Sequence, residues 1–220
     1  AFEESLAQAV KDAGLAKEDV QKIFATGSGR TSLKIADDTV DEIKAMAKGA
    51  HFFFPHARTV IDIGAEEGRA AKMDEQGNVE DFAINEKCAA GAGAFIEGMA
   101  RALDVAVEEM GPLCLQSDRQ IPMNAQCVIF AESDVVNLIH ANTEKPEISK
   151  AIHDAIASRI ASIIRRIGIN EDIVMLGGVG YNLGFIDALR RELKIDTIYI
   201  PDEPEYGAAV GAAILAAETA

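Results

Sequence analysis

The sequence contains little cysteine, and what it has does not form a disulfide framework. Three cysteines occur in 220 residues, an odd number, and their spacing matches no pairing pattern of small secreted domains. A disulfide-stabilised scaffold is therefore excluded. Thiols of this kind are typical of a reducing compartment, where they are available for metal or redox chemistry, so we expect a cytoplasmic protein.

Long apolar runs and an excess of positive charge are also absent. No apolar run approaches the roughly 18 residues that predict a membrane-spanning helix. The sequence begins Ala1-Phe2-Glu3-Glu4, which is acidic where a secretory signal is basic. There are 21 Lys and Arg against 36 Asp and Glu, which gives a net charge of −15. This charge argues against nucleic acid or an anionic membrane as a partner.

What the sequence does contain is an alternation of apolar strands with helical patterns, which predicts an α/β fold. Buried strands are predicted at residues 59–64 and 173–176, with a hairpin formed by 69–73 and 79–84. Shorter strands are predicted at 20–26 and 197–200. Helices are predicted from apolar spacing at 6–15, 38–49 (with Asp37 or Asp38 as the N-cap), 95–103, 128–139, 148–167, 185–193 and 206–217.

Three glycine-rich segments follow or adjoin these strands. Asp62-Ile63-Gly64-Ala65-Glu66 puts a carboxylate inside a strand and a glycine at its end, an arrangement that can approach phosphate and hold Mg²⁺. Residues 177–182, Gly-Gly-Val-Gly-Tyr-Asn, follow a second buried strand and could pack against a base and ribose, although a tight structural turn is an equal alternative. Residues 207–213 predict a helix face for close packing. Neither a P-loop nor a Gly-x-Gly-x-x-Gly motif occurs.

Two of the cysteines, Cys88 and Cys127, lie in matched settings, each just before a stretch with helical spacing. A helix N-terminus favours a thiolate. Two thiolates cannot complete the four-cysteine ligation of an iron–sulfur cluster, but two copies of such a chain can. Cys114 has no such setting and is expected to be a structural or surface thiol, and the histidines show no ligand spacing.

Taken together, five segments resemble a known family. They are residues 60–64, 87–97, 127–135, 177–182 and 207–213. They look like the ATP-dependent activators of 2-hydroxyacyl-CoA dehydratases and the ATPase subunits of benzoyl-CoA reductase, within the actin, Hsp70 and sugar-kinase superfamily. After the Asp-Ile-Gly strand, Ala65-Glu66-Glu67-Gly68-Arg69 replaces the Gly-Gln-Asp and lysine of the activators, and this is closer to a benzoyl-CoA reductase ATPase subunit.

The resemblance implies an actin-like ATPase fold of the ribonuclease H type. It implies that residues 1–58 are the remainder of the N-terminal actin-like subdomain, and that residues 59–220 form the second subdomain with the cluster-binding helices. The family also has a first phosphate loop in a glycine-rich hairpin. Nothing in this sequence matches that hairpin, so we expect the chain to lack it.

The resemblance also implies site residues and cofactors. It implies ATP and Mg²⁺, and one [4Fe–4S] cluster shared between two protomers with Cys88 and Cys127 of each as ligands. Asp62 and Glu66 would act at the phosphates. The remaining residues implied to bind the nucleotide are Gly64, Ala65, Gly177, Gly178, Val179 and Asn182.

The implied partners are an identical or paralogous protomer, the catalytic subunits of a CoA-ester dehydratase or reductase, and ferredoxin or flavodoxin as electron donor. The implied function is to hydrolyse ATP and to deliver a low-potential electron. One alternative stays open from the residues alone, namely an actin-like small-molecule kinase in which the cysteines are incidental and no cluster is bound.

Overall fold

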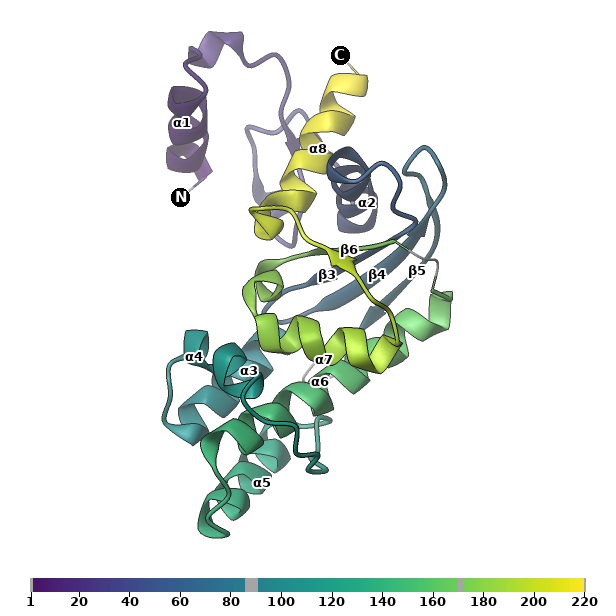
Figure 1. Ribbon diagram of the computed structural model, residues 1–220. Coiled ribbons are helices and arrows are strands. Elements are labelled where there is room, and N and C mark those ends of the chain that lie inside the picture. Colours follow the sequence, from purple (N-terminus) through teal and green to yellow (C-terminus); the bar gives the residue numbers. More distant parts are fainter. Residues whose placement is uncertain (1, 86–90, 170–171, 220) are drawn as a thin grey trace.

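A computed structural model describes residues 2–85, 91–169 and 172–219 (Figure 1). Within these residues a five-stranded sheet has the order β5-β4-β3-β6-β7. Strand β3 pairs antiparallel with β4 and parallel with β6, while β5 extends the antiparallel side and β7 the parallel side. The strands are β3 (Thr59–Ile63), β4 (Gly68–Met73), β5 (Val79–Asn85), β6 (Ile173–Leu176) and β7 (Ile198–Tyr199).

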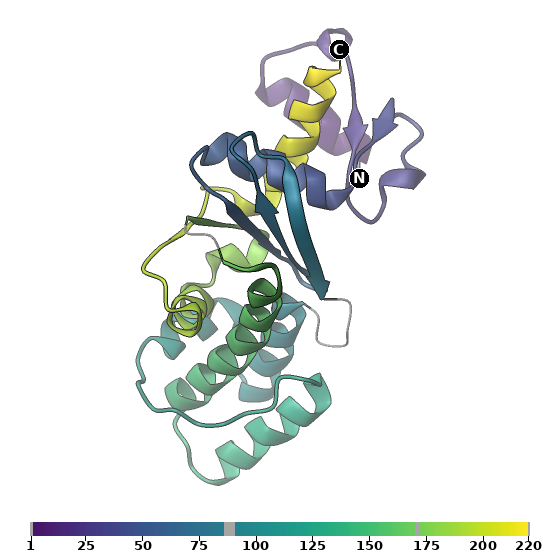
Figure 2. The same cartoon turned by 90° about the vertical axis from the view of Figure 1, so that its right-hand side faces the viewer.

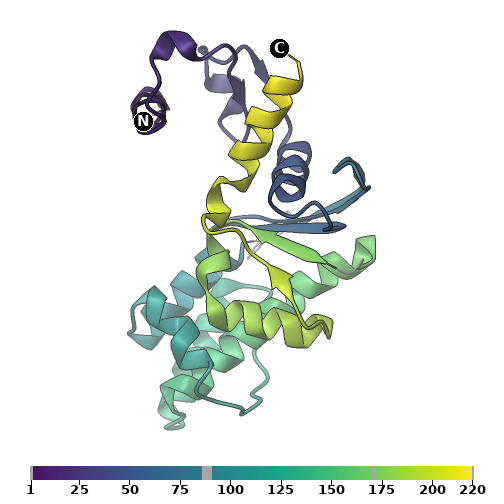
Figure 3. The same ribbon diagram turned by 45° about the horizontal axis from the view of Figure 1, so that its top comes forward.

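Helices cover both faces of this sheet (Figures 1 and 3). On one face, α2 (Glu42–Phe53) packs on Val60 and Val174, and α8 (Gly207–Glu218) packs against α2. On the other face, Ile61 and Met175 face α6 (Lys145–Ile167) and α7 (Leu183–Leu193). Successive residues of each strand thus serve opposite cores, as the strand period of two requires.

The small residues of 207–213 are used for close packing, as predicted. A Cβ added to Gly211 would lie 1.8 Å from the carbonyl oxygen of Ala45 in α2. The two helix backbones are therefore in contact, and glycine at this position is a steric requirement.

Three further helices lie beyond the end of the sheet where β3 and β6 terminate (Figure 1). They are α3 (Ala92–Leu103), α4 (Val107–Cys114) and α5 (Val128–His140). Helix α3 packs against α4, α5 and α6. At the opposite end, the parallel pair β1 (Phe24–Ala25) and β2 (Asp38–Thr39) lies beside α8, while α1 (Phe2–Asp12) stands apart from that helix (Figures 1 and 2).

Most of the predicted elements are confirmed, including both buried strands, the hairpin and the helix that ends at Gly168, where φ is +76°. The N-cap of the helix predicted from 38 is wrong. Helix α2 begins at Glu42, because Asp41 caps it by accepting the backbone N–H of Lys44 at 2.9 Å, whereas Asp38 lies in β2. Helix α4 was not predicted. Among the described residues, no helix has the length and apolarity needed to cross a bilayer.

Candidate functional site

A cavity of about 610 Å³ opens beside the turns that follow β3 and β6. Helices α3 and α4 form its other walls. Of the residues predicted to bind nucleotide, Gly64, Ala65, Gly178, Val179 and Asn182 all line this cavity. Its lining is completed by Gly93, Ile96, Glu97, Val107, Glu108, Gly111, Pro112, Tyr181 and Leu183. The fold therefore brings two turns that lie more than a hundred residues apart in sequence to one cavity.

The turn after β3, residues 64–67, is called the first turn below, and it is bonded directly to the start of α3. The backbone N–H groups of Gly93 and Ala94 donate to the carbonyl oxygens of Gly64 and Ala65, at 3.1 and 2.9 Å. A Cβ on Gly91, the N-cap of α3, would lie 1.9 Å from the carbonyl oxygen of Ala65. The first turn thus rests on the N-terminal turn of α3 with no space for a side chain between them.

Asp62 lies one residue inside the end of β3, and its side chain is 15% exposed. Burial raises the pKa of its carboxyl group, and the Arg69 guanidinium, with Nη1 4.0 Å from Oδ2, opposes this rise. Across the sheet, Gly177 has φ +87°, and a Cβ there would lie 2.6 Å from Asp62 Oδ1. The carboxylate is therefore held between an arginine and the glycine that directly follows β6.

Arg69 is a residue of this site that the sequence reasoning missed. It stands opposite Asp62 in the antiparallel register of β3 and β4. Its guanidinium also contacts the Glu67 carboxylate and bonds Glu42 Oε2 at 2.9 Å. The missed signal was the hairpin register, which places an arginine directly across from the strand carboxylate. Glu66 is exposed and, like Asp62, Arg69 and Gly177, is not among the described residues that line the cavity.

The turn after β6, residues 177–182, is called the second turn below, and it leads into α7. Its middle forms a short 3₁₀ helix, Gly178–Tyr181, and Asn182 caps α7 by accepting the backbone N–H of Phe185 at 3.0 Å. The hydroxyl of Tyr181 donates to Glu205 Oε2 at 2.8 Å, which raises its pKa to about 12. Both Tyr181 and Asn182 belong to the lining of the cavity.

Of the two predicted cluster ligands, Cys88 lies outside the described residues. Cys127 is the N-cap residue of α5, with extended backbone (φ −139°, ψ 132°), and is half-buried. Its neighbour Val128 lies against α3, since a Cβ on Gly98 would be 3.3 Å from Val128 Cγ1. The expected position of Cys127 at a helix N-terminus is confirmed. No group of three His, Cys, Asp or Glu side chains that could hold a metal occurs in the described part of the chain.

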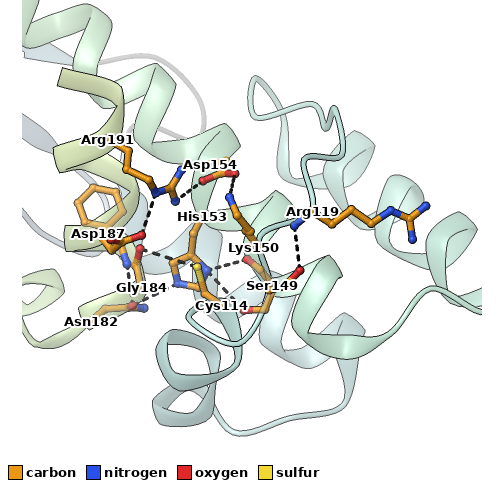
Figure 4. Close-up of polar contacts among 12 residues, drawn as sticks. Cys114, Arg119, Ser149, Lys150, His153, Asp154, Asn182, Gly184, Asp187 and Arg191 are labelled. Carbon is orange, nitrogen blue, oxygen red and sulfur yellow. Dashed lines mark hydrogen bonds and ion pairs between the residues drawn. The ribbon is translucent and has the colours of Figure 1, made fainter. Parts of the chain in front are cut away.

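Cys114 is structural, as expected. It is buried at the end of α4, with Sγ 3.9 Å from the carbonyl oxygen of Gly184, and burial raises the pKa of its thiol to about 12. Of the histidines, His153 is fully buried on α6 and contacts Asn182 rather than solvent (Figure 4).

Comparison with known proteins identifies the family of this chain. Residues 1–216 match the BadF/BadG/BcrA/BcrD ATPase family. The chain belongs to this family. It is 40% identical to an activator of lactoyl-CoA dehydratase from Anaerotignum propionicum, over 98% of this chain and 83% of that protein. It is 34% identical to one of the subunits of benzoyl-CoA reductase from Thauera aromatica, over 96% of this chain and 77% of that protein.

A solved structure agrees with this assignment. The activator of the 2-hydroxyisocaproyl-CoA dehydratase from Clostridium difficile, with bound ADPNP, superposes with a TM-score of 0.89 and 35% identity. The match covers 97% of this chain and 80% of that one. The predicted family, the actin-like fold and the ATPase class are therefore confirmed. The roles of the individual site residues stay predictions.

Proposed function

We propose that this chain is an ATP-hydrolysing activator that passes a low-potential electron from ferredoxin or flavodoxin to a CoA-ester dehydratase or reductase. Two relatives bear the names of such components, and a third is named with a bound ATP analogue. The observation that carries the proposal is the pair of backbone hydrogen bonds from Gly93 and Ala94 to the first turn. They join a turn at the cavity to the helix that follows Cys88.

The nucleotide would occupy the cavity between the two turns. The second turn and the apolar side chains of Val107, Pro112 and Leu183 suit a base and ribose, because such sites combine an apolar lining with a few placed polar groups. The first turn would then face the phosphates. Mg²⁺ would be held by Asp62 and Glu66 together with phosphate oxygens, since this ion takes few protein ligands. The positive charge of the ion would favour the ionised form of Asp62 against the effect of burial.

The cysteines suit an iron–sulfur cluster that two protomers share. The chain supplies thiols at Cys88 and Cys127, and a [4Fe–4S] cluster needs four. Ile129 and Phe130, two and three residues after Cys127, have exposed side chains, at 69% and 63% exposure. Apolar groups of this size suit burial against a second protomer. When bound, the cluster would supply the one-electron carrier.

The coupling we propose runs through the protein backbone. A nucleotide shifts a conformational equilibrium only if its contacts differ between the two states, and loss of the terminal phosphate changes the contacts of the first turn. Because the carbonyl oxygens of Gly64 and Ala65 accept from α3, a movement of this turn moves the start of α3. That movement would reach the Cys88 segment without any intervening side chain.

Anaerobic purification tests this function. We expect brown protein that contains iron and sulfide, hydrolyses ATP, and shifts from dimer to monomer when the iron is chelated, because shared ligation contributes association energy. A colourless protein that phosphorylates a small molecule would instead support the kinase alternative. A dimer that persists at the same concentration after complete cluster loss would contradict the shared cluster.

A further inference from the structure

His153 is a buried histidine with two oxygen neighbours. Its side chain is fully buried on α6. One ring nitrogen, Nδ1, lies 2.7 Å from the carbonyl oxygen of Ser149, and the other, Nε2, lies 3.2 Å from Asn182 Oδ1 (Figure 4). The ring therefore joins the middle of α6 to the residue that begins α7 and lines the cavity.

Both oxygens are committed as acceptors. The Ser149 oxygen is a backbone carbonyl, which cannot donate. Asn182 Oδ1 also accepts the backbone N–H of Phe185 at 3.0 Å, so the amide cannot reverse without losing the cap of α7. Gly111 closes the space around it, since a Cβ there would lie 2.8 Å from this oxygen. A histidine with one ring proton can donate to one of these acceptors, and the doubly protonated ring to both.

The hydroxyl group beside the His153 ring is already used as a donor to another atom. The hydroxyl of Ser149 lies 3.4 Å from Nδ1, but it already donates to the carbonyl oxygen of Met110 at 2.7 Å. The charged and titratable groups nearby come from the helices packed on His153, namely Lys150 and Asp154 on α6, Asp187 and Arg191 on α7, and Cys114 on α4.

The protonation of His153 is set by opposing effects. Burial lowers its pKa most, and the contacts with Ser149, Asn182 and Asp154 raise it. At neutral pH the free protein therefore holds mainly the singly protonated ring. The shorter contact, to Ser149, keeps that proton on Nδ1, and Nε2 then faces Asn182 Oδ1 as one acceptor against another.

We propose that His153 is a positioning residue for the nucleotide cavity: when protonated on both nitrogens it holds Asn182 Oδ1 inside the protein, so that the amino group of Asn182 donates to the ligand. The proposal rests on the proposed function, in that the ligand is a nucleotide. In the free protein the repulsion between Nε2 and Oδ1 opposes the cap and disfavours this orientation of Asn182, so a ligand that accepts from its amino group also favours the proton on Nε2. Since such linkage is reciprocal, nucleotide binding takes up a proton, and affinity falls as pH rises through the pKa that His153 has in the complex.

Two substitutions separate this role from simple packing. His153→Gln places an amide donor near the position of Nε2 but cannot titrate, whereas His153→Asn places one near Nδ1 and leaves Asn182 without its donor. Calorimetric titration with ADPNP, in buffers of different ionisation enthalpy, measures affinity and proton uptake together. We expect proton uptake by the unsubstituted protein beyond that of His153→Gln, which corrects for protonation of the ligand. We expect His153→Asn to bind about fivefold to tenfold more weakly at low pH, the cost of one hydrogen bond.

Other results would overturn the proposal. These are equal proton uptake by the unsubstituted protein and His153→Gln, or unweakened binding by His153→Asn. If the variants fail to fold, the nitrogen chemical shifts of His153 in the unsubstituted protein decide the question, because a singly protonated ring in the ADPNP complex contradicts it. An unsubstituted protein that does not bind ADPNP refutes the nucleotide site itself. Binding without proton uptake refutes only the role of His153.

Discussion

The two turns that border the cavity both begin with two small residues, but they are attached to the rest of the fold in different ways. The first turn is bonded through its own backbone to α3, with Gly64 and Ala65 accepting from Gly93 and Ala94. The second turn is held by the Asn182 cap of α7 and by a hydrogen bond from the backbone N–H of Gly177 to the carbonyl oxygen of Pro204 at 2.9 Å, in the segment before α8.

Because of this difference, we expect the two turns to have different roles in nucleotide binding. A turn bonded to another helix transmits its movement, whereas a turn held at a strand end and by a helix cap stays in place and can fix a base. In the proposed activator, the first turn would therefore report the state of the phosphates to the Cys88 segment. The second turn would anchor the nucleotide.

The largest expected effect is a loss of bound iron, and it distinguishes Cys127, a proposed cluster ligand, from Cys114, which lies near the second turn. Cys127→Ala should abolish bound iron, because one of the two thiolates of each chain is lost. Cys114→Ala, at the contact with Gly184 near the second turn, should retain it. Iron and sulfide analysis of anaerobically purified protein measures both. Full iron content in Cys127→Ala would remove this residue from the cluster.

Glycine substitutions test the turns directly. Gly91→Ala puts a methyl group 1.9 Å from the Ala65 carbonyl oxygen, so α3 must separate from the first turn, at a cost of about 1–3 kcal/mol of stability. We expect ATP-dependent electron transfer to fall much more than ADPNP affinity. Gly177→Ala, which combines positive φ with a contact to Asp62, should instead weaken ADPNP binding.

Gly29→Ala is the matched control, since no atom lies within 4 Å of the added Cβ and Gly29 is not among the residues that line the cavity. It should leave stability and coupling close to those of the unsubstituted protein. If Gly91→Ala reduces electron transfer no more than Gly29→Ala does, the first turn is not the coupling element.

How far the sequence predicted these features depends on the kind of signal. Strand β3 and helix α6 could be predicted from the spacing of their apolar residues, and the burial of those residues confirms both elements. Helix α4 has Gly111 and Pro112 in its last turns, which weaken a helical pattern, and it packs against the distant helices α6 and α7. The cap of α2 was misplaced because several aspartates precede it, and only the position of the Lys44 N–H selects Asp41.

Prediction of the site from the sequence has the same limit, because contacts between distant segments leave no local pattern. Glycine turns after buried strands are visible in the sequence, and they do converge on one cavity. The link between Arg69 and Asp62 needs the register of β3 and β4. The hydrogen bonds between the first turn and α3 depend on packing between distant segments, which no local pattern specifies.

The smallest expected effect concerns Asp62 and pH. Burial raises its pKa above the ordinary value of 3.8, so the folded protein binds this proton more tightly than the unfolded chain does. The contribution of Asp62 to stability is then greatest below pH 3.8, and it declines as pH rises through the raised pKa. Asp62→Asn should remove this decline, which chemical denaturation across that pH range would detect.

The same substitution also tests the phosphate site. Asp62→Asn should retain iron but lose ATP hydrolysis, and with it ATP-dependent electron transfer. Normal rates of both in Asp62→Asn would contradict the role of Asp62 at the phosphates.

The most direct test of the coupling is amide hydrogen exchange at Gly93 and Ala94, because these two N–H groups form the bonds to the first turn. Exchange would be measured on the anaerobic protein with ADPNP and with ADP, using the N–H of Phe185 at the second turn as reference. We predict that exchange at Gly93 and Ala94 differs between the two nucleotides while exchange at Phe185 stays the same. Equal protection of Gly93 and Ala94 in both complexes would contradict a coupling path through the first turn.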